Sequence, residues 1–378
     1  MPHGYAEKML LVLALVAPAA ACGGFVPTPG KLAASDAQQA LFDLGTDRIT
    51  VTYRARYEGD ADDFAWVLAV PGTVTAVEEG DADRLDRLLA LSAPVVSVDP
   101  AISEESGCGC GSSYGLKNDR AGGGGDTGVT VTGQGFAGDF EYTTLAATDA
   151  DSLKTWLDDH GYDTTLIAPA IAEYVADPLD YEFVAVQLRP DVEPTEAGVV
   201  LDPLALTYGA GADGELHAIF PAKLGQSSSV SYVRTEWLVL GSGTATLSGW
   251  EPVANPDEKD GHPWDVAGPD YVDAAGLYAQ LLLHHGDTRR KAWEAWAGAV
   301  DDGGTERWLT RYDAMVTPAT NTVDPEFADG SSTVEATTVI YIQDETAFQE
   351  ELTPSEEYYV AGVGMLGLAG WLRRRRRG

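Results

Sequence analysis

The residues of this sequence best suited to chemistry are the carboxylates of a short acidic turn. Asp60, Asp62 and Asp63 lie between an alternating segment and an apolar one. Clustered carboxylate oxygens are the ligands that Ca²⁺ prefers, and paired carboxyl groups also serve in general acid–base catalysis. The same cluster is typical of a solvated turn between two strands. We therefore expect a hairpin tip, with a calcium site or the centre of a hydrolase or metal-dependent enzyme as the alternative.

Other potential catalytic residues lack suitable neighbours. His284 and His285 are adjacent, and adjacent side chains on a helix diverge by about 100°, which disfavours a shared metal ion. Ser227–Ser229 lacks the glycine pattern of a nucleophile elbow. His217 falls within a predicted strand. The sequence therefore favours a binding or structural protein over an enzyme, since an enzyme would require the acidic turn to converge with His217 or another polar group.

The N-terminus has the composition of a secretory signal. Lys8 is followed by an apolar run from Met9 to Ala17, then by Pro18 and small residues before Cys22. A basic residue, a short apolar core and small residues at the cleavage site are the parts of such a signal. We expect residues 1–21 to be removed on export.

The C-terminus combines a hydrophobic segment with a cluster of arginines. Residues 358–372 carry no charge. As a helix they would be about 22 Å long, against an apolar bilayer thickness of about 30 Å. Flanking arginines can snorkel to the interface, and their position predicts a cytoplasmic C-terminus. We expect a transmembrane-like anchor over residues 358–378, joined to the body by a linker over residues 346–357. The predicted anchor residues are Tyr358, Trp371, Arg373, Arg374 and Arg375.

The chain has three cysteines, Cys22, Cys108 and Cys110, and an exported protein meets an oxidising compartment. Three thiols cannot all pair within one chain. Either a lipid caps Cys22 while Cys108 and Cys110 close a tight ring, or Cys22 bonds to one of the other two. The second arrangement closes a loop of more than 80 residues, which stabilises the fold by about 4 kcal/mol in the chain-entropy model. We favour it because a lipid would duplicate the C-terminal anchor. A zinc site is disfavoured because the sequence offers no second ligand pair at zinc spacing.

The formal net charge of −35 limits the partners. Such a surface repels nucleic acid and anionic lipid headgroups, so we exclude nucleic acid as a partner. The hydrophobic fraction of 44% excludes wholesale disorder. We expect contact with a membrane through the C-terminal segment, and we leave a protein or glycan partner open. Calcium is the only cofactor that the sequence suggests.

Two strands frame the acidic turn. Ile49–Tyr57 alternates apolar and polar residues, and Phe64–Pro71 is more continuously apolar, so we expect a hairpin. Leu204–Tyr208 and Leu216–Pro221 repeat this arrangement weakly.

The remaining segments mix strands and helices without regular βαβ alternation. This predicts an α+β fold with a largely antiparallel sheet and several short helices. Further strands are expected at residues 128–132, 140–145, 181–188 and 229–240. Helices are expected at residues 82–91, with Leu85, Leu88, Leu89 and Leu91 on one face, and at residues 153–160, 167–175, 271–285 and 289–300.

Six short segments share a pattern with one known family. In chain order they are CGGF (22–25), YEGDADDFAWVLAVP (57–71), CGCG (108–111), LKTWLDDHGY (153–162), LTRYDAM (309–315) and DPEF (324–327). With them the chain resembles the exported bacterial family catalogued as domain of unknown function 2330. The family is uncharacterised and implies no activity. The resemblance implies that Cys22 and the Cys108–Cys110 pair belong to one structural device. The tail is similar to the sorting tails of exported bacterial proteins, although residues 352–357 lack their short motif.

Together these features predict an exported cell-envelope protein that has a binding or structural role and is not an enzyme. The family domain is expected over residues 22–345, with a β-rich part at 22–250 and a helical, then stranded part at 265–345. It would lie on the outer side of the inner membrane or at the cell surface. A lipoprotein lipidated at Cys22 and an exported hydrolase using the acidic turn are the alternatives.

Overall fold

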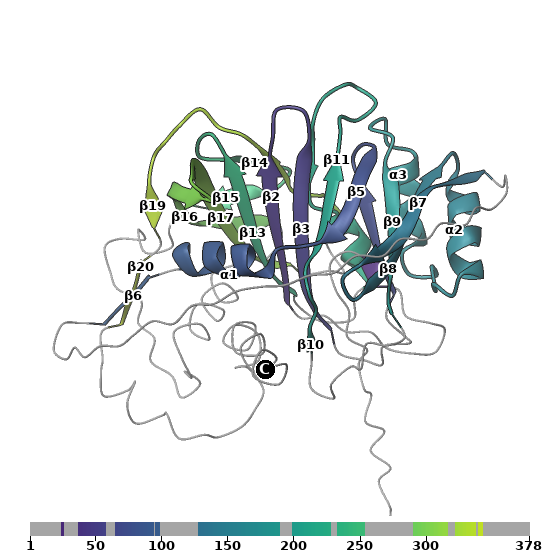
Figure 1. Ribbon diagram of the computed structural model, residues 1–378, viewed down its shortest axis with the longest axis horizontal. Coiled ribbons are helices and arrows are strands. Elements are labelled where there is room, and N and C mark those ends of the chain that lie inside the picture. Colours follow the sequence, from purple (N-terminus) through teal and green to yellow (C-terminus); the bar gives the residue numbers. More distant parts are fainter. Residues whose placement is uncertain are drawn as a thin grey trace, which may run out of the picture.

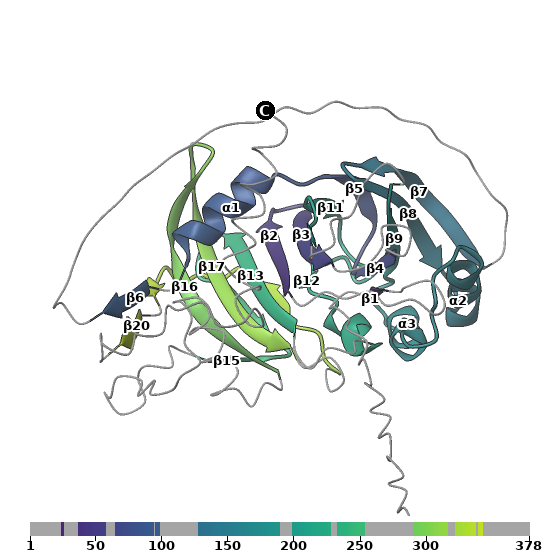
Figure 2. The same cartoon turned by 90° about the horizontal axis from the view of Figure 1, so that it is seen from below.

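The described chain forms two facing β-sheets with helices on their outer sides (Figures 1 and 2). The structure is a computed structural model. It describes residues 24–25, 37–57, 65–93, 95–98, 128–189, 199–227, 233–253, 290–316, 322–337 and 339–342.

The larger sheet has ten strands and is mostly antiparallel. Across the sheet these are β15 (Glu251–Val253), β16 (Lys291–Asp302), β17 (Thr305–Val316), β13 (Val233–Gly241), β2 (Ala37–Leu44), β3 (Ile49–Tyr57), β11 (Leu204–Tyr208) and β5 (Val74–Glu79), with β10 (Val199–Val200) paired to β3 and β19 (Ala336–Thr337) paired to β16. Only β13–β2 and β15–β16 are parallel pairs among these described strands. The N-terminal and C-terminal parts of the chain are thereby joined in one sheet.

The second sheet has five antiparallel strands. They are β1 (Gly24–Phe25), β4 (Ala65–Val70), β9 (Glu182–Leu188), β8 (Phe140–Ala147) and β7 (Val129–Ala137). Two small sheets complete the described strands. One contains β12 (Ala218–Ile219), β18 (Glu326–Ala328) and β14 (Thr246–Ser248), and the other pairs β20 (Val339–Ile342) in parallel with β6 (Val95–Val98).

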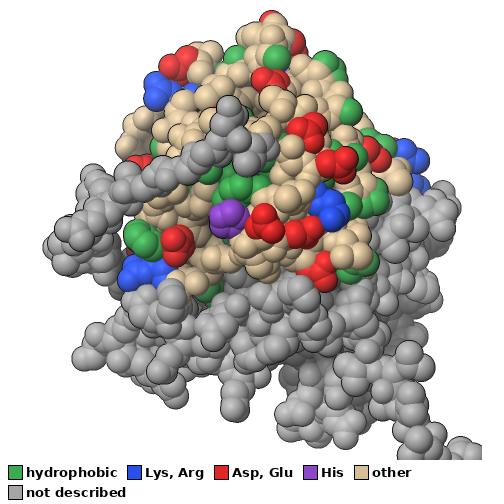
Figure 3. All heavy atoms as spheres, turned by 90° about the vertical axis from the view of Figure 1, so that its right-hand side faces the viewer, with side chains coloured by type: hydrophobic (Ala, Val, Ile, Leu, Met, Phe, Trp, Pro, Cys, Tyr) green, Lys and Arg blue, Asp and Glu red, His purple; other side chains and the backbone are tan. Residues whose placement is uncertain are grey.

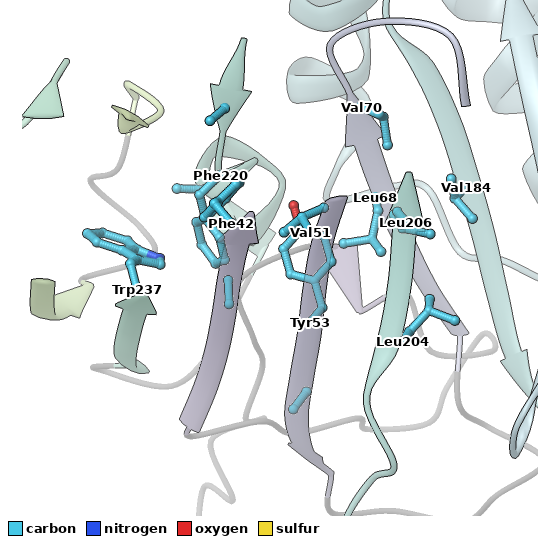
Figure 4. Packing of buried hydrophobic residues seen from close by; sticks show 14 of the residues in the cluster. Phe42, Val51, Tyr53, Leu68, Val70, Val184, Leu204, Leu206, Phe220 and Trp237 are labelled. Carbon is cyan, nitrogen blue, oxygen red and sulfur yellow. The ribbon is translucent and has the colours of Figure 1, made fainter. Parts of the chain in front are cut away.

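The main core lies between the two large sheets (Figure 4). Because successive side chains of a strand point to opposite faces of the sheet, one strand can supply residues to two hydrophobic cores. On β4, Trp66, Leu68 and Val70 belong to the core between the sheets, whereas Val67 and Ala69 belong to a second core on the outer face. The alternation therefore lets a single apolar strand hold the sheets together and bind the helices outside.

The core is aromatic where the strands of the small sheet enter it. The ring centroid of Trp237, on β13, lies 5.4 Å from that of Phe220 and 5.6 Å from that of Phe327. Tyr53 on β3 lies 6.1 Å from Phe220 and 5.9 Å from Trp66 on β4. These separations are in the range of favourable aromatic pairs, so the rings pack β3 against the opposite sheet.

Helices cover the outer faces of both sheets. Helix α1 (Ala82–Leu91) lays Leu85 and Leu88 against the larger sheet. Helices α2 (Ala150–Asp159) and α3 (Ala168–Val175) cover the five-stranded sheet. The resulting order of layers is helix, sheet, sheet, helices.

The sequence located all three described helices, and the ends of α1 and α2 carry strong local signals. Asp81 accepts a hydrogen bond from the backbone N–H of Arg84, and Asp149 accepts one from that of Ser152, as N-cap residues do. Gly161 follows α2 with φ of +89°, a conformation that glycine adopts freely. The predicted face of α1 is wrong at one position, because the side chain of Leu91 is 52% exposed.

The predicted hairpin of residues 49–57 and 64–71 is wrong. Strand β3 pairs with β2, β10 and β11, while β4 pairs with β1 and β9 in the other sheet. The two strands face one another across the core instead of sharing hydrogen bonds. The second predicted pair behaves likewise, since β11 lies in the ten-stranded sheet and β12 in the small one. In both places the chain crosses from one sheet to another.

The predicted helix over residues 289–300 is also wrong, since residues 291–300 belong to strand β16. Asp302 pairs with Thr305, so Gly303 and Gly304 form a two-residue turn, with φ of +65° and +86°. Such a turn is a strong hairpin signal, and pairing with β17 overrides the helical propensity of the alanines. Trp293 on this strand is buried, at 4% exposed.

The prediction of a largely antiparallel fold is confirmed. Three α-helices lie in the described part of the chain, and none is long and apolar enough to cross a membrane. The helix predicted at residues 271–285 and the anchor predicted at 358–372 lie outside the described residues.

Candidate functional site

Most residues that the sequence singled out for chemistry lie outside the described ranges. These are Asp60, Asp62 and Asp63 of the acidic turn, the cysteines Cys22, Cys108 and Cys110, and the histidines His284 and His285. Their predicted roles stay predictions. His217 is the described member of the predicted set, and it leads to a polar cluster beside the small sheet.

His217 is held between two carboxylates. Its Nδ1 lies 2.7 Å from Glu326 Oε1, and its Nε2 lies 2.9 Å from Asp213 Oδ2. Burial disfavours the charged imidazole, but the hydrogen bonds to Glu326 and Asp213 outweigh it and raise the pKa of His217. Because the carboxylates bind opposite nitrogens of the ring, they do not converge on one point. No group of three His, Cys, Asp or Glu within the described ranges could hold a metal ion.

Asp324, two residues before Glu326 in the sequence, is buried and belongs to a second polar group. Lys223 Nζ lies 3.6 Å from Asp324 Oδ2 and 3.5 Å from Glu173 Oε2. The backbone N–H of Lys223 donates to Asp324 Oδ1 over 2.8 Å, and Tyr174 Oη donates to Asp324 Oδ2 over 2.8 Å. The ammonium also lies 4.5 Å from the ring centroid of Tyr174, within the range of a cation–π contact. We refer to Lys223, Asp324, Glu173 and Tyr174 as the lysine–aspartate site.

The acidity of Asp324 reflects this environment. Burial raises its pKa, while Lys223 and the hydrogen bonds from Lys223 and Tyr174 lower it, and the balance leaves the pKa at about 6. Burial also raises the pKa of Tyr174, and the Asp324 carboxylate adds to that effect. A perturbed carboxyl group beside an amine is a typical sign of a functional site, although structural ion pairs perturb pKa values too.

Three separate elements bring these side chains together. Lys223 lies on the short helix η2 (Ala222–Ser227), Tyr174 and Glu173 lie on α3, and Asp324 precedes β18. The segment carrying Asp324 is fixed on both sides. Phe220 donates its backbone N–H to Pro325 O over 3.0 Å, and the Trp250 indole donates to Val323 O over 2.8 Å.

A second charged cluster lies between α1 and the larger sheet. Arg311 on β17 contacts Glu236 on β13 and Asp313 on its own strand, while Arg234 contacts the same Glu236. Burial opposes the ionisation of Glu236, but Arg234 and Arg311 lower its pKa to about 2. For Asp313 burial dominates and raises the pKa. Opposite charges thus compensate one another under α1, as buried ion pairs must.

Sequence reasoning missed both clusters, because their members are far apart in the chain. Lys223 and Asp324 are separated by 101 positions, and Tyr174 and Asp324 by 150. Asp324 opens one of the segments quoted for the family resemblance, but nothing in that segment indicates a contact with Lys223 or Tyr174.

Two packed sheets with outer helices, and a buried lysine–aspartate site at their margin, define a layered β-sandwich protein. The chain belongs to the family described as "uncharacterized protein conserved in bacteria", domain of unknown function 2330, whose sequence model matches residues 16–229. This match covers more than half of the chain and confirms the predicted family.

Comparison with solved structures gives a weak likeness to the crystal structure of baculovirus P35. It has 9% sequence identity, covers 81% of this chain and 97% of that chain, and has a TM-score of 0.33. A likeness at this level carries no argument about fold or function. No curated protein matches the chain.

Proposed function

We propose that this chain is an exported cell-envelope protein whose β-sandwich body binds or supports a partner, and that its C-terminal segment holds it at the membrane. The proposal that the body has a binding or structural role, and not an enzymatic one, rests on one observation: the buried charged side chains pair with one another. Arg311 binds both Glu236 and Asp313 and also contacts α1, which is a structural use of charged groups. His217 likewise joins the loop of Asp213 to β18.

The acidic surface of the protein supports a location of the folded domain outside the cytoplasm. Figure 3 shows the face that carries α2 and α3. On this face acidic side chains lie close to one another, whereas basic side chains lie apart from one another. On α2 the exposed carboxylates are Asp151, Asp158 and Asp159. With a net charge of −35, such a surface favours solubility and disfavours contact with anionic lipid headgroups. Contact with the bilayer would then depend on residues 358–372.

Cell fractionation tests the anchor. Cells would produce the full chain, a form truncated after Glu357, and a control truncated after Leu372 that keeps the apolar segment but lacks the arginines. We expect the full chain and the control in the membrane fraction and the form truncated after Glu357 in the soluble fraction. If the full chain and the Glu357 form partition identically in the soluble fraction, the anchor proposal is wrong.

Two further measurements test export and the cysteines. Protease added to spheroplasts should degrade the body of the full chain if the body lies outside the inner membrane. Mass analysis of the mature N-terminus should give a non-acylated Cys22, bonded to Cys108 or Cys110. An acylated Cys22 would instead establish the lipoprotein alternative.

A further inference from the structure

The lysine–aspartate site places an amine against a carboxyl group in a largely buried setting. The side chains of Lys223 and Asp324 are 14% and 8% exposed, and Lys223 Nζ lies 3.6 Å from Asp324 Oδ2. The ion pair therefore holds the amine beside the carboxyl group, and groups held together in this way gain reactivity from proximity. We propose that Lys223 and Asp324 condense to form an intramolecular isopeptide bond, and that Glu173 carries the proton.

The surroundings of Asp324 favour attack at its carboxyl carbon. The protonated carboxylic acid is the electrophilic form, and a pKa of about 6 keeps this form accessible near neutral pH. The backbone N–H of Lys223 donates to Oδ1, and the Tyr174 hydroxyl donates to Oδ2. Two donors aimed at the carboxyl oxygens stabilise the negative charge that develops during the attack, as in an oxyanion hole.

Glu173 is placed to carry the proton. Its Oε2 lies 3.5 Å from Lys223 Nζ, and its side chain is 57% exposed, so it can exchange protons with water. The Glu173 carboxylate takes a proton from the ammonium, and the free amine forms a C–N bond to Cγ of Asp324. As the tetrahedral intermediate collapses, Glu173 protonates the departing hydroxyl, so that the C–O bond breaks and water leaves. The nitrogen loses a second proton, which passes through Glu173 to solvent. No electrons are gained or lost, and no co-reactant is required.

Such a bond would fasten the two parts of the chain covalently. Lys223 lies within the residues matched by the family model, and Asp324 lies beyond them, 101 positions away. The bond would join η2 to the segment before β18 at the margin of the core. A covalent crosslink between distant positions restricts the unfolded chain and resists the agents that reduce disulfides.

Peptide mapping of the full chain tests the proposal. The purified protein would be denatured, reduced and alkylated, then digested and analysed by mass spectrometry. We expect one branched peptide that contains both Lys223 and Asp324, with the summed mass of the two linear peptides less one water, and no tryptic cleavage after Lys223. Linear peptides that carry Lys223 and Asp324 separately, with cleavage after Lys223, would overturn the proposal.

Variants separate the chemistry from folding. Lys223→Arg and Asp324→Ala should abolish the branched peptide. Because either variant disturbs a buried site, Glu173→Gln at an exposed position is the sharper test, with exposed Glu215→Gln as the matched control. Loss of a general acid–base group lowers a rate by about a hundredfold or more, so Glu173→Gln should leave newly made protein largely uncrosslinked. Crosslinking of Glu173→Gln at the rate of the control would overturn the role of Glu173.

Discussion

Arg311 on β17 donates a hydrogen bond from Nη1 to the backbone oxygen of Leu89, 3.2 Å away in the last turn of α1. A guanidinium at this end of a helix binds carbonyl groups that have no partner within the helix and complements the helix dipole. The same side chain contacts Glu236 and Asp313 in the sheet below. Arg311 is therefore the link between α1 and the larger sheet.

We predict that Arg311→Met destabilises the protein severely. Removing one partner of a buried charge cluster leaves Glu236 and Asp313 uncompensated, which typically costs about 3–5 kcal/mol. The free energy of unfolding in urea measures this. Arg48→Ala is the control, because the Arg48–Asp47 pair is solvent-exposed and such pairs contribute about 1 kcal/mol or less. Similar losses in the two variants would show that the cluster under α1 is not a structural link.

Two leucines of α1 give a matched test of the apolar contact. Leu85 is completely buried, whereas Leu91 is 52% exposed. Leu85→Ala should lower the free energy of unfolding by about 2–5 kcal/mol, because it leaves a cavity between helix and sheet. Leu91→Ala should change it by about 0.5 kcal/mol or less. Equal effects in denaturant titrations would contradict the placement of α1.

The contacts of His217 predict a pH dependence of stability. Its pKa is raised in the folded protein, so the protonated ring stabilises the fold fully below the ordinary pKa of 6.5. That contribution is lost as the pH rises through the higher, folded pKa. We expect unfolding titrations to show a fall in stability above about pH 6.5 that His217→Asn abolishes. An unchanged slope in the variant would mean that the imidazole is not the titrating group.

The turn between β16 and β17 is expected to require residues that tolerate positive φ. Gly303 has φ of +65°, and a Cβ added there meets no atom within 4 Å. Any cost of substitution is therefore conformational. Gly303→Val should destabilise the protein by about 1–2 kcal/mol, whereas Gly303→Asn should cost less, because asparagine adopts this region more readily. Thermal unfolding of the two variants measures the difference, and equal melting temperatures would count against a turn at this position.

Local patterns identified several elements accurately. The predicted helices at residues 82–91 and 153–160 correspond to α1 and α2, and the predicted strand at residues 181–188 corresponds to β9. The segment at residues 291–300 is a strand and not the predicted helix, because its strand structure depends on pairing with β17 and on the Gly303–Gly304 turn. When the local sequence is compatible with either a helix or a strand, the strand with which the segment can pair determines its structure.

The sequence by itself determined the composition, the charge, the family and the positions of the described helices and of several strands, because these depend on residues close together in the chain. The tertiary structure alone decided that β3 and β4 face one another from opposite sheets, and that Lys223 meets Asp324. Strand pairing and side-chain contact depend on which distant surfaces bury the most apolar area together. That choice is a property of the whole chain, so no local spacing could encode the lysine–aspartate site.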